Sequence, residues 1–287
     1  MMKCNEINLR DPFILHEDGL YYMYGTRGQG YGIQTGGFDV YTSTDLENWS
    51  EPTPCFDSEK YDLNTWANWA PEVHKYKNSY YMLATFTRAH NNLRATFILK
   101  ADNPKGPFVP HGNGPLTPED WECLDGTLYI DKKGQPYLVF CHEHTQIIDG
   151  TICYVPLNDD LSKAVGEPIL LFAASSFLQL KDAYTPGKHC VTDGPFFYRS
   201  SEDDLFMIWS TGIKGNYVQC LVKFNGGEIG NDFTHLPVIF EENGGHGMIF
   251  SFEGQPYLTL HSPNTKTLER PAFFPIAIYP DHITILS

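Results

Sequence analysis

Three aspartates stand at the starts of strand-like runs, where an apolar or small residue is usual. They are Asp11, Asp125 and Asp193, and each is followed directly by Pro or Gly. Pro and Gly hold unusual backbone turns and let a ligand approach the main chain closely. A single aspartate of this kind is usually a turn residue. Three of them at positions that look equivalent in a repeat indicate one shared site.

Carboxyl groups that cluster in one site do not all ionise together. Neighbouring negative charges raise the pKa of a carboxyl group, so one member of a cluster can stay protonated while another stays ionised. A protonated and an ionised carboxyl group on either side of a sugar linkage are what the hydrolysis of a glycosidic bond requires. The three aspartates therefore predict a site that can cleave glycosides.

The surrounding sequence offers side chains that suit a sugar. Flat aromatic rings can stack on sugar faces; the candidates are Trp66, Trp69, Trp121, Tyr31 and Phe196, and for Trp69 plain packing stays open as the alternative. Polar groups can bind hydroxyls; the candidates are Arg27, Glu72, His142, Glu143 and Arg270. His246 opens the fifth strand-like run between glycines. For His246, a structural hydrogen bond and contact with water or a metal ion are both open.

The aspartates belong to β-hairpins that recur five times along the chain. Each copy has an apolar run, a cluster of turn residues and an aromatic-rich run with a period of two. The copies begin near residues 11, 70, 125, 193 and 245, at intervals of 52 to 68 residues. A further strand-like stretch follows each hairpin, so each interval has room for the four strands of a propeller blade. The pattern predicts an all-β, five-bladed β-propeller whose first strands line a central channel, with a β-sandwich or β-helix as the alternative.

Composition and charge favour one acidic catalytic domain over residues 1–287. No Gly/Ser/Pro-rich run or block of charges divides the chain. With 35 acidic and 20 basic residues, its formal net charge of −15 disfavours nucleic acid and membrane partners. The seven Cys form no C-x-x-C pair, which is typical of reduced thiols. Because the sequence shows no signal segment, we expect a cytoplasmic location, unless an export signal has been removed.

The ordered motifs resemble those of glycoside hydrolase family 43 almost from end to end. The matching segments are Leu9-Arg10-Asp11-Pro12-Phe13-Ile14, Trp69-Ala70-Pro71-Glu72-Val73, Leu124-Asp125-Gly126-Thr127-Leu128-Tyr129, Asp193-Gly194-Pro195-Phe196 and Gly245-His246-Gly247. The resemblance implies a five-bladed propeller that hydrolyses arabinose-, xylose- or galactose-containing glycans with inversion, for example as an α-L-arabinofuranosidase or a β-xylosidase.

The resemblance also implies roles for individual residues. Asp11 would be the general base, Asp125 the residue that adjusts the pKa of the acid and orients it, and Asp193 the general acid. No organic cofactor is expected, but a calcium or sodium ion would lie on the channel axis near His246.

One residue departs from the pattern of that family. Its acid is usually Glu in a Glu-Gly-Pro motif, whereas Asp193 is one methylene shorter. Glu143, in Cys141-His142-Glu143-His144, is the alternative proton donor, or it binds a sugar hydroxyl. The alternative function is a non-catalytic, lectin-like propeller that binds carbohydrate but has lost efficient proton donation.

Overall fold

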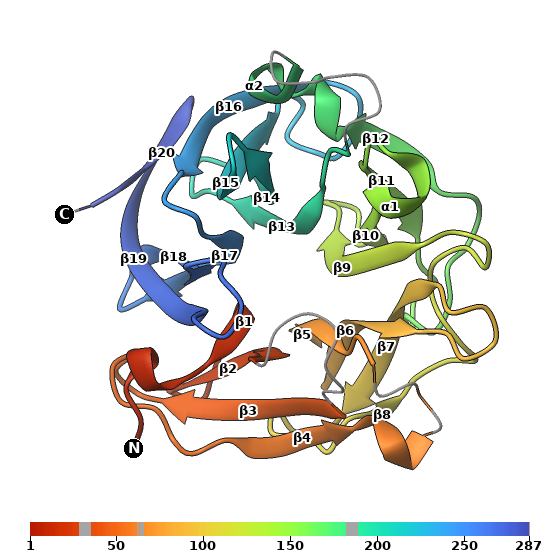
Figure 1. Ribbon diagram of the computed structural model, residues 1–287, viewed down its shortest axis with the longest axis vertical. Helices are drawn as coiled ribbons and strands as arrows, with labels where there is room; N and C mark the ends of the chain where they lie inside the picture. Colours follow the sequence, from red (N-terminus) through yellow and green to blue (C-terminus); the bar gives the residue numbers. More distant parts are fainter. Residues whose placement is uncertain (29–35, 62, 64–65, 182–188, 287) are drawn as a thin grey trace.

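The chain forms five four-stranded antiparallel sheets arranged around a central axis (Figure 1). The structure is a computed structural model and describes residues 1–28, 36–61, 63, 66–181 and 189–286. Each sheet is one blade, and its strands follow one another in chain order from the axis outwards. The predicted all-β, five-bladed propeller is therefore confirmed, and the sandwich and β-helix alternatives are wrong.

The blades take up the chain in sequence. The bounds of their strands are, in blade 1, β1 Leu9–Glu17, β2 Leu20–Arg27, β3 Gly37–Ser43 and β4 Thr53–Asp57; in blade 2, β5 Trp69–Tyr76, β6 Ser79–Thr87, β7 Arg94–Ala101 and β8 Val109–Pro110; in blade 3, β9 Cys123–Ile130, β10 Pro136–His142, β11 Thr151–Pro156 and β12 Ile169–Ala173; in blade 4, β13 Asp193–Arg199, β14 Leu205–Ile213, β15 Asn216–Phe224 and β16 Phe233–Phe240; in blade 5, β17 Gly245–Phe252, β18 Gln255–Ser262, β19 Arg270–Tyr279 and β20 His282–Ile285. The α-helices are short, α1 His144–Ile147 and α2 Leu178–Lys181. In the described part of the chain, no helix is long and apolar enough to cross a membrane.

Local sequence explains the inner hairpins. Asp18 and Gly19 join β1 to β2 with φ values of 50° and 76°, which is the two-residue turn that matches the twist of paired strands. Glu253 and Gly254 repeat this turn between β17 and β18, with φ values of 50° and 82°. The alternating apolar residues of these strands then face the neighbouring blades. Four buried apolar clusters fill the space between adjacent sheets, so both faces of most strands lie in the core.

The inner strand of every blade carries the same irregularity. In each blade, two consecutive residues have no partner in the pairing with the second strand, which is the signature of a β-bulge. The first unpaired residue has a positive φ in all five blades: Asp11 (53°), Ala70 (47°), Asp125 (55°), Gly194 (51°) and His246 (51°). The second is always Pro or Gly: Pro12, Pro71, Gly126, Pro195 and Gly247. Four of the five blades therefore hold an L-residue in a conformation that costs about 1–2 kcal/mol.

The bulge corrects one sequence-based prediction. Asp11 and Asp125 are the first bulge residues of their blades, but in blade 4 that position belongs to Gly194. Asp193 lies one residue earlier and pairs with Ser210, as Arg10 pairs with Thr26. The three aspartates are therefore not equivalent in the repeat. Because all three are followed by Pro or Gly, the sequence pattern does not reveal that Asp193 lies one residue earlier in the repeat.

Each bulge is tied to the preceding blade through its backbone N–H. The acceptors lie at equivalent positions of the second strands: Thr26 Oγ1 for Ala70 (2.7 Å), Thr85 Oγ1 for Asp125 (2.9 Å), Ser210 Oγ for His246 (2.7 Å) and His261 Nδ1 for Asp11 (3.2 Å). Blade 3 has Cys141 at this position, and the Gly194 N–H donates instead to Asp125 Oδ2 (3.2 Å). The five bulges thus form a ring of contacts from blade to blade.

Side chains close the propeller where blade 5 meets blade 1. Asn8 Nδ2 donates to the Glu269 carbonyl oxygen (2.9 Å), and Arg10 Nη1 lies 3.0 Å from Glu269 Oε1. Arg270 Nε donates to the carbonyl oxygen of Asn5 (2.8 Å). No sheet in the described part of the chain contains strands from both ends, so these contacts hold the two terminal blades together.

The tight packing around the second bulge residue can be tested by substitution. A Cβ on Gly247 would lie 2.2 Å from the Thr259 carbonyl oxygen, so Gly247→Ala should lower the free energy of unfolding by about 2 kcal/mol through overpacking. Gly212→Ala, in β14, is the control, because nothing lies within 4 Å of its Cβ, and it should change stability by less than about 0.5 kcal/mol. Urea unfolding measures both, and equal losses would contradict this account of the bulge.

Candidate active site

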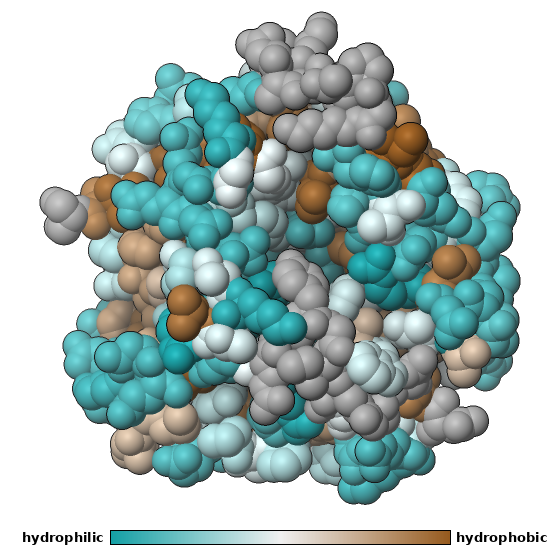
Figure 2. Space-filling model, viewed as in Figure 1, coloured by the Kyte–Doolittle hydropathy of each residue, from teal (hydrophilic) through white to brown (hydrophobic). Residues whose placement is uncertain are grey.

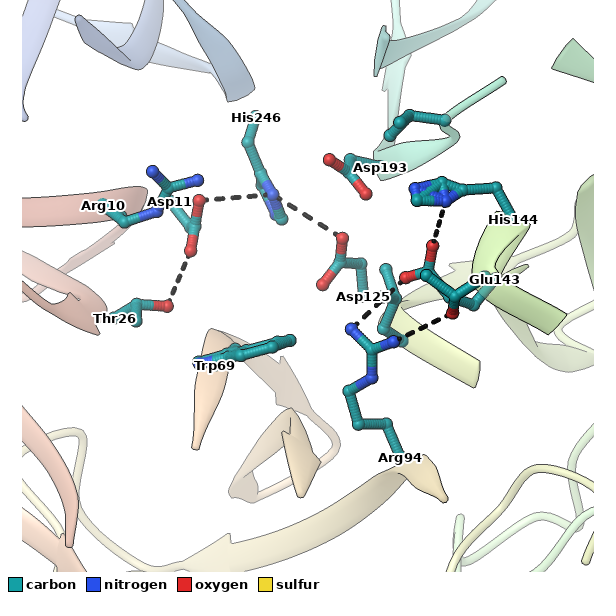
Figure 3. A pocket seen from close by; sticks show the side chains of 13 residues that line it. Arg10, Asp11, Thr26, Trp69, Arg94, Asp125, Glu143, His144, Asp193 and His246 are labelled. Atoms are coloured by element: carbon teal, nitrogen blue, oxygen red, sulfur yellow. Dashed lines mark hydrogen bonds and ion pairs between the residues drawn. The ribbon is translucent and has the colours of Figure 1, made fainter. Parts of the chain in front are cut away.

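A cavity of about 290 Å³ opens at one end of the channel. Its lining contains four carboxyl groups, from Asp11, Asp125, Asp193 and Glu143 (Figure 3). The other lining residues are Arg10, Thr26, Trp69, Arg94, Leu124, His144, Thr145, Val191 and His246. Figure 2 shows that the face of the molecule is hollowed near its centre and that hydrophilic residues border the hollow.

The bulge explains why so many inner-strand residues reach one cavity. Successive residues of a regular strand point to opposite faces. At the bulge this alternation fails, so Arg10 and Asp11 both line the cavity, and so do Leu124 and Asp125. Each blade can thereby contribute two neighbouring side chains to the cavity. One belongs to the residue before the bulge and the other to the first bulge residue.

Asp11 is a buried carboxylate with one oxygen held by a hydrogen bond and the other next to two imidazole rings. Thr26 Oγ1 donates to its Oδ2 (2.6 Å). Its Oδ1 lies 3.3 Å from Nδ1 of both His246 and His261, but no described group donates a hydrogen bond to it. Burial alone would raise the pKa of Asp11, yet His246, His261 and Arg10 outweigh it and hold this pKa well below its usual range. Asp11 is therefore ionised at neutral pH, as a general base must be, and its Oδ1 is buried beside the two imidazole rings.

Asp193 has the opposite character. Tyr217 donates its hydroxyl to Asp193 Oδ2 (2.9 Å). Burial and the negative charge of Glu143 nevertheless raise the pKa of Asp193 to about 7, with the hydrogen bond from Tyr217 acting against them. Asp193 therefore keeps its proton up to neutral pH and can donate it, as a general acid must.

Asp125 and His246 lie between these two groups. Asp125 Oδ2 accepts the Gly194 N–H (3.2 Å) and lies 3.7 Å from His246 Nδ1 (Figure 3). Burial, followed by the charges of Asp193 and Asp11, raises the pKa of Asp125 well above its usual value. Burial also lowers the pKa of His246 to about 4, so its imidazole is neutral at neutral pH.

Glu143 is held by two basic side chains at the start of α1. Its Oε2 lies 3.4 Å from Arg94 Nη1, and its Oε1 lies 2.9 Å from His144 Nδ1 (Figure 3). Burial would raise the pKa of Glu143, but His144 and Arg94 outweigh it, so the net pKa is lowered. An ionised Glu143 suits proton donation less well than Asp193 does. Among the carboxylates, Glu143 raises the pKa of Asp193 most. The family resemblance predicts this effect for Asp125 instead.

Two predicted sugar-binding arginines lie outside the cavity lining. Arg27 Nη2 pairs with Asp39 Oδ1 (2.6 Å). Arg270 donates to the carbonyl oxygens of Asn5 and Glu269 (2.8 and 2.7 Å). The Arg27 guanidinium therefore forms a contact within blade 1, and the Arg270 guanidinium forms a contact between the two ends of the chain.

Glu72 and Phe196 also lie outside the lining, because they come just after the bulge. Their pairing with the second strand is regular again, so they lie deeper in the channel than the cavity residues. Glu72 Oε2 lies 2.9 Å from His74 Nε2, and burial raises its pKa. The Phe196 ring packs against the Phe13 ring with centroids 5.9 Å apart.

Trp69 is the predicted aromatic residue that does line the cavity, with the Arg94 guanidinium 5.2 Å from its ring centre. His142 stacks on Trp121 with centroids 4.2 Å apart, outside the lining. The other predicted stacking residues are Trp66, which is 50% exposed and outside the lining, and Tyr31, which lies outside the described residues.

Sequence reasoning missed several residues that shape the site. Thr26, Arg94 and Tyr217 belong to second and third strands, and nothing in their local sequence marks a contact with another blade. Arg10 and His144 could have been found, since each directly adjoins a carboxylate of a quoted motif.

A metal ion near His246 finds little support from protein ligands. The described residues contain no group of three or more His, Cys, Asp or Glu side chains that could hold an ion. The His246 Nδ1 is directed at Asp11 and Asp125. The described residues therefore offer a poor set of protein ligands for an ion, and the axial ion stays a prediction.

Both the sequence and the fold of the chain match known proteins. A sequence profile of the glycosyl hydrolases family 43 matches residues 5–271. The endo-arabinase from Bacteroides thetaiotaomicron VPI-5482 is 35% identical, with a TM-score of 0.86 and 98% of each chain covered. A thermostable family-43 glycoside hydrolase (21% identity, TM-score 0.81, 98% of this chain and 93% of that one) has the same fold. So does an endo-1,4-beta-xylanase from the same Bacteroides strain (22%, 0.73, 98% and 95%). No curated protein matches the chain significantly.

The electrostatics of the cavity can be tested directly. Glu143→Gln removes the negative charge that raises the pKa of Asp193, so this pKa should fall from about 7. Titration of the aspartate carboxyl carbons by ¹³C NMR measures it. Glu122→Gln is the matched control, because Glu122 also pairs with Arg94 (2.6 Å) but does not line the cavity. An unchanged Asp193 in Glu143→Gln, or an equal fall in the control, would show that Glu143 does not set this pKa.

Proposed function

The chain belongs to glycosyl hydrolase family 43 and is a glycoside hydrolase, and we propose that its substrate is a glycan or oligosaccharide with α-L-arabinofuranosyl linkages. One observation supports the reaction: Asp11, whose pKa is held well below its usual range, and Asp193, whose pKa is raised to about 7, line the same cavity. The sugar is inferred from the 35% identity to a structure described as an endo-arabinase. β-Xylosides and galactosides are the alternative substrates.

In the proposed reaction, Asp11 acts as the general base. It removes a proton from a water molecule while the water oxygen bonds to the anomeric carbon. Asp193 donates its proton to the glycosidic oxygen as the bond between that oxygen and the anomeric carbon breaks. Because the displacement occurs once, the anomeric configuration inverts.

The remaining cavity residues support these two groups. Asp125 holds the Gly194 N–H next to Asp193 and thereby orients the acid. Glu143, fixed by Arg94 and His144, keeps the pKa of Asp193 high and is available to a sugar hydroxyl. The ring of Trp69 offers an apolar face at the cavity wall on which a sugar can stack.

The substrate and the base are tested together. Aryl α-L-arabinofuranosides, β-xylosides and β-galactosides, and arabinan, are incubated with the wild type, and the anomer first released is identified by ¹H NMR. We expect turnover of the arabinofuranosides with inversion. Asp11→Asn should lower kcat by about 10³-fold with little change in KM, because the amide keeps the shape but cannot take a proton.

Asp281→Asn is the control for this experiment, since Asp281 lies in an exposed turn of blade 5. It should leave the rate unchanged. Full activity of Asp11→Asn would remove Asp11 from the reaction, and preferred turnover of a xyloside or galactoside would change the proposed sugar.

The acid is identified by its dependence on the leaving group. Asp193→Ala should slow substrates with poor leaving groups by about 10³-fold, but aryl glycosides with good leaving groups by less than about tenfold, because these need little proton assistance. Rates for a series of aryl glycosides with different phenol pKa values measure this. If Glu143→Ala shows the selective loss instead, Glu143 is the acid.

A further inference from the structure

Two buried hydroxyl groups each hold one oxygen of a carboxyl group in the cavity. Thr26 Oγ1 donates to Asp11 Oδ2 at 2.6 Å, and the Tyr217 hydroxyl donates to Asp193 Oδ2 at 2.9 Å. Thr26 lies at the end of β2 and Tyr217 near the start of β15, so neither belongs to an inner strand. Both side chains are buried, Thr26 with 5% and Tyr217 with 7% of its surface exposed.

The direction of the Thr26 hydrogen bond is fixed by its other contact. A hydroxyl has one proton to donate and two lone pairs that accept. Thr26 Oγ1 accepts the Ala70 N–H at 2.7 Å, a group that can only donate. The hydroxyl proton is therefore free to point at Asp11, and the contact with blade 2 prevents the hydroxyl from turning away. A hydrogen bond donated to a carboxylate favours its ionised form.

Tyr217 is fixed by packing. Its ring stacks on His261 with centroids 5.6 Å apart and planes 22° apart. His261 in turn accepts the Asp11 N–H on Nδ1 (3.2 Å), so this stack contacts both the base and the acid. A Cβ on Gly245 would lie 2.8 Å from the Tyr217 ring. Gly245 thus leaves the space for this ring at the position before the bulge, which is Arg10 in blade 1 and Asp193 in blade 4.

We propose that Thr26 and Tyr217 are positioning residues: Thr26 fixes the base and Tyr217 fixes the acid, each through a hydrogen bond donated to Oδ2. This inference rests on the proposed roles of Asp11 and Asp193. It assigns one hydroxyl to each carboxyl group, so removal of either hydroxyl should change one ionisation and spare the other.

The two variants should move opposite limbs of the pH profile. Asp11 must be ionised, so activity is lost as pH falls through its pKa. Thr26→Val removes a hydrogen bond to the ionised form, raises this pKa and moves the acidic limb of kcat/KM to higher pH. Asp193 must be protonated, so activity is lost as pH rises through its pKa of about 7. Tyr217→Phe raises that pKa and moves the alkaline limb to higher pH.

Matched control variants distinguish a loss of positioning from a general loss of stability. Thr26→Ser keeps the hydroxyl and should restore the acidic limb. Thr85→Val removes the equivalent hydroxyl of blade 2, which accepts the Asp125 N–H (2.9 Å). In blade 2 the first bulge residue is Ala70, so the Thr85 hydroxyl has no carboxyl group of its own blade to bind. This variant should lose stability comparable to that of Thr26→Val, measured by urea unfolding, without moving the acidic limb.

The same titrations are followed by ¹³C NMR of the aspartate carboxyl carbons, which requires no turnover. We expect the Asp11 pKa to rise in Thr26→Val alone and the Asp193 pKa to rise in Tyr217→Phe alone. Unchanged carboxyl titrations, or a joint shift of both groups in either variant, would overturn the inference. If Asp11→Asn retains activity, the proposed function fails, and the NMR titrations still decide whether the two hydroxyls act on these carboxyl groups.

Discussion

The backbone N–H of the first bulge residue in each inner strand sets the architecture of this propeller. The bulge leaves this donor without a partner in its own sheet, and an unpaired buried donor costs about 1–3 kcal/mol. The preceding blade supplies the acceptor in every case, and in four of them it comes from the second strand, from Thr26, Thr85, Ser210 and His261. The hydrogen bond that pairs the buried N–H of each bulge therefore also fixes the relative position of two blades. The side chains of the bulges meet at one cavity because these contacts hold all five inner strands in the same register.

Blade 3 is the exception in this ring, and it is chemically the most informative. Its second strand carries Cys141 where the others carry a hydroxyl or imidazole. The next bulge N–H, from Gly194, is bound by the carboxylate of Asp125 instead. Cys141 is fully buried, and burial together with the charges of Asp125 and Asp193 raises the pKa of its thiol well above the usual value. A cavity carboxyl group thus takes over a structural task in the one blade that lacks the usual acceptor.

The sequence predicted what depends on local pattern and missed what depends on strand register and on contacts between strands. Turn residues such as Asp18-Gly19 and the alternation of apolar residues are local, so the hairpins, the repeat and the propeller could be inferred. The register of Asp193 could not, because Asp193-Gly194-Pro195 fits the bulge equally well with either of its first two residues in the first bulge position. Glu72 and Phe196 have side chains that suit a sugar, but they follow the bulge and lie deeper in the channel. Thr26 and Tyr217 carry no local signal, since their partners are 15 and 24 residues away on other strands.

The closure between the terminal blades has a consequence for how the cavity forms during synthesis. Asp11 is synthesised before His246 and His261, which lie beside its Oδ1 and belong to blade 5. Glu269, the partner of Arg10, is made later still. A nascent chain that has synthesised four blades carries all the carboxyl groups of the cavity, but it lacks the imidazole groups of His246 and His261 and the partner of Arg10. The complete cavity is then a property of the finished ring, formed when blade 5 docks against blade 1.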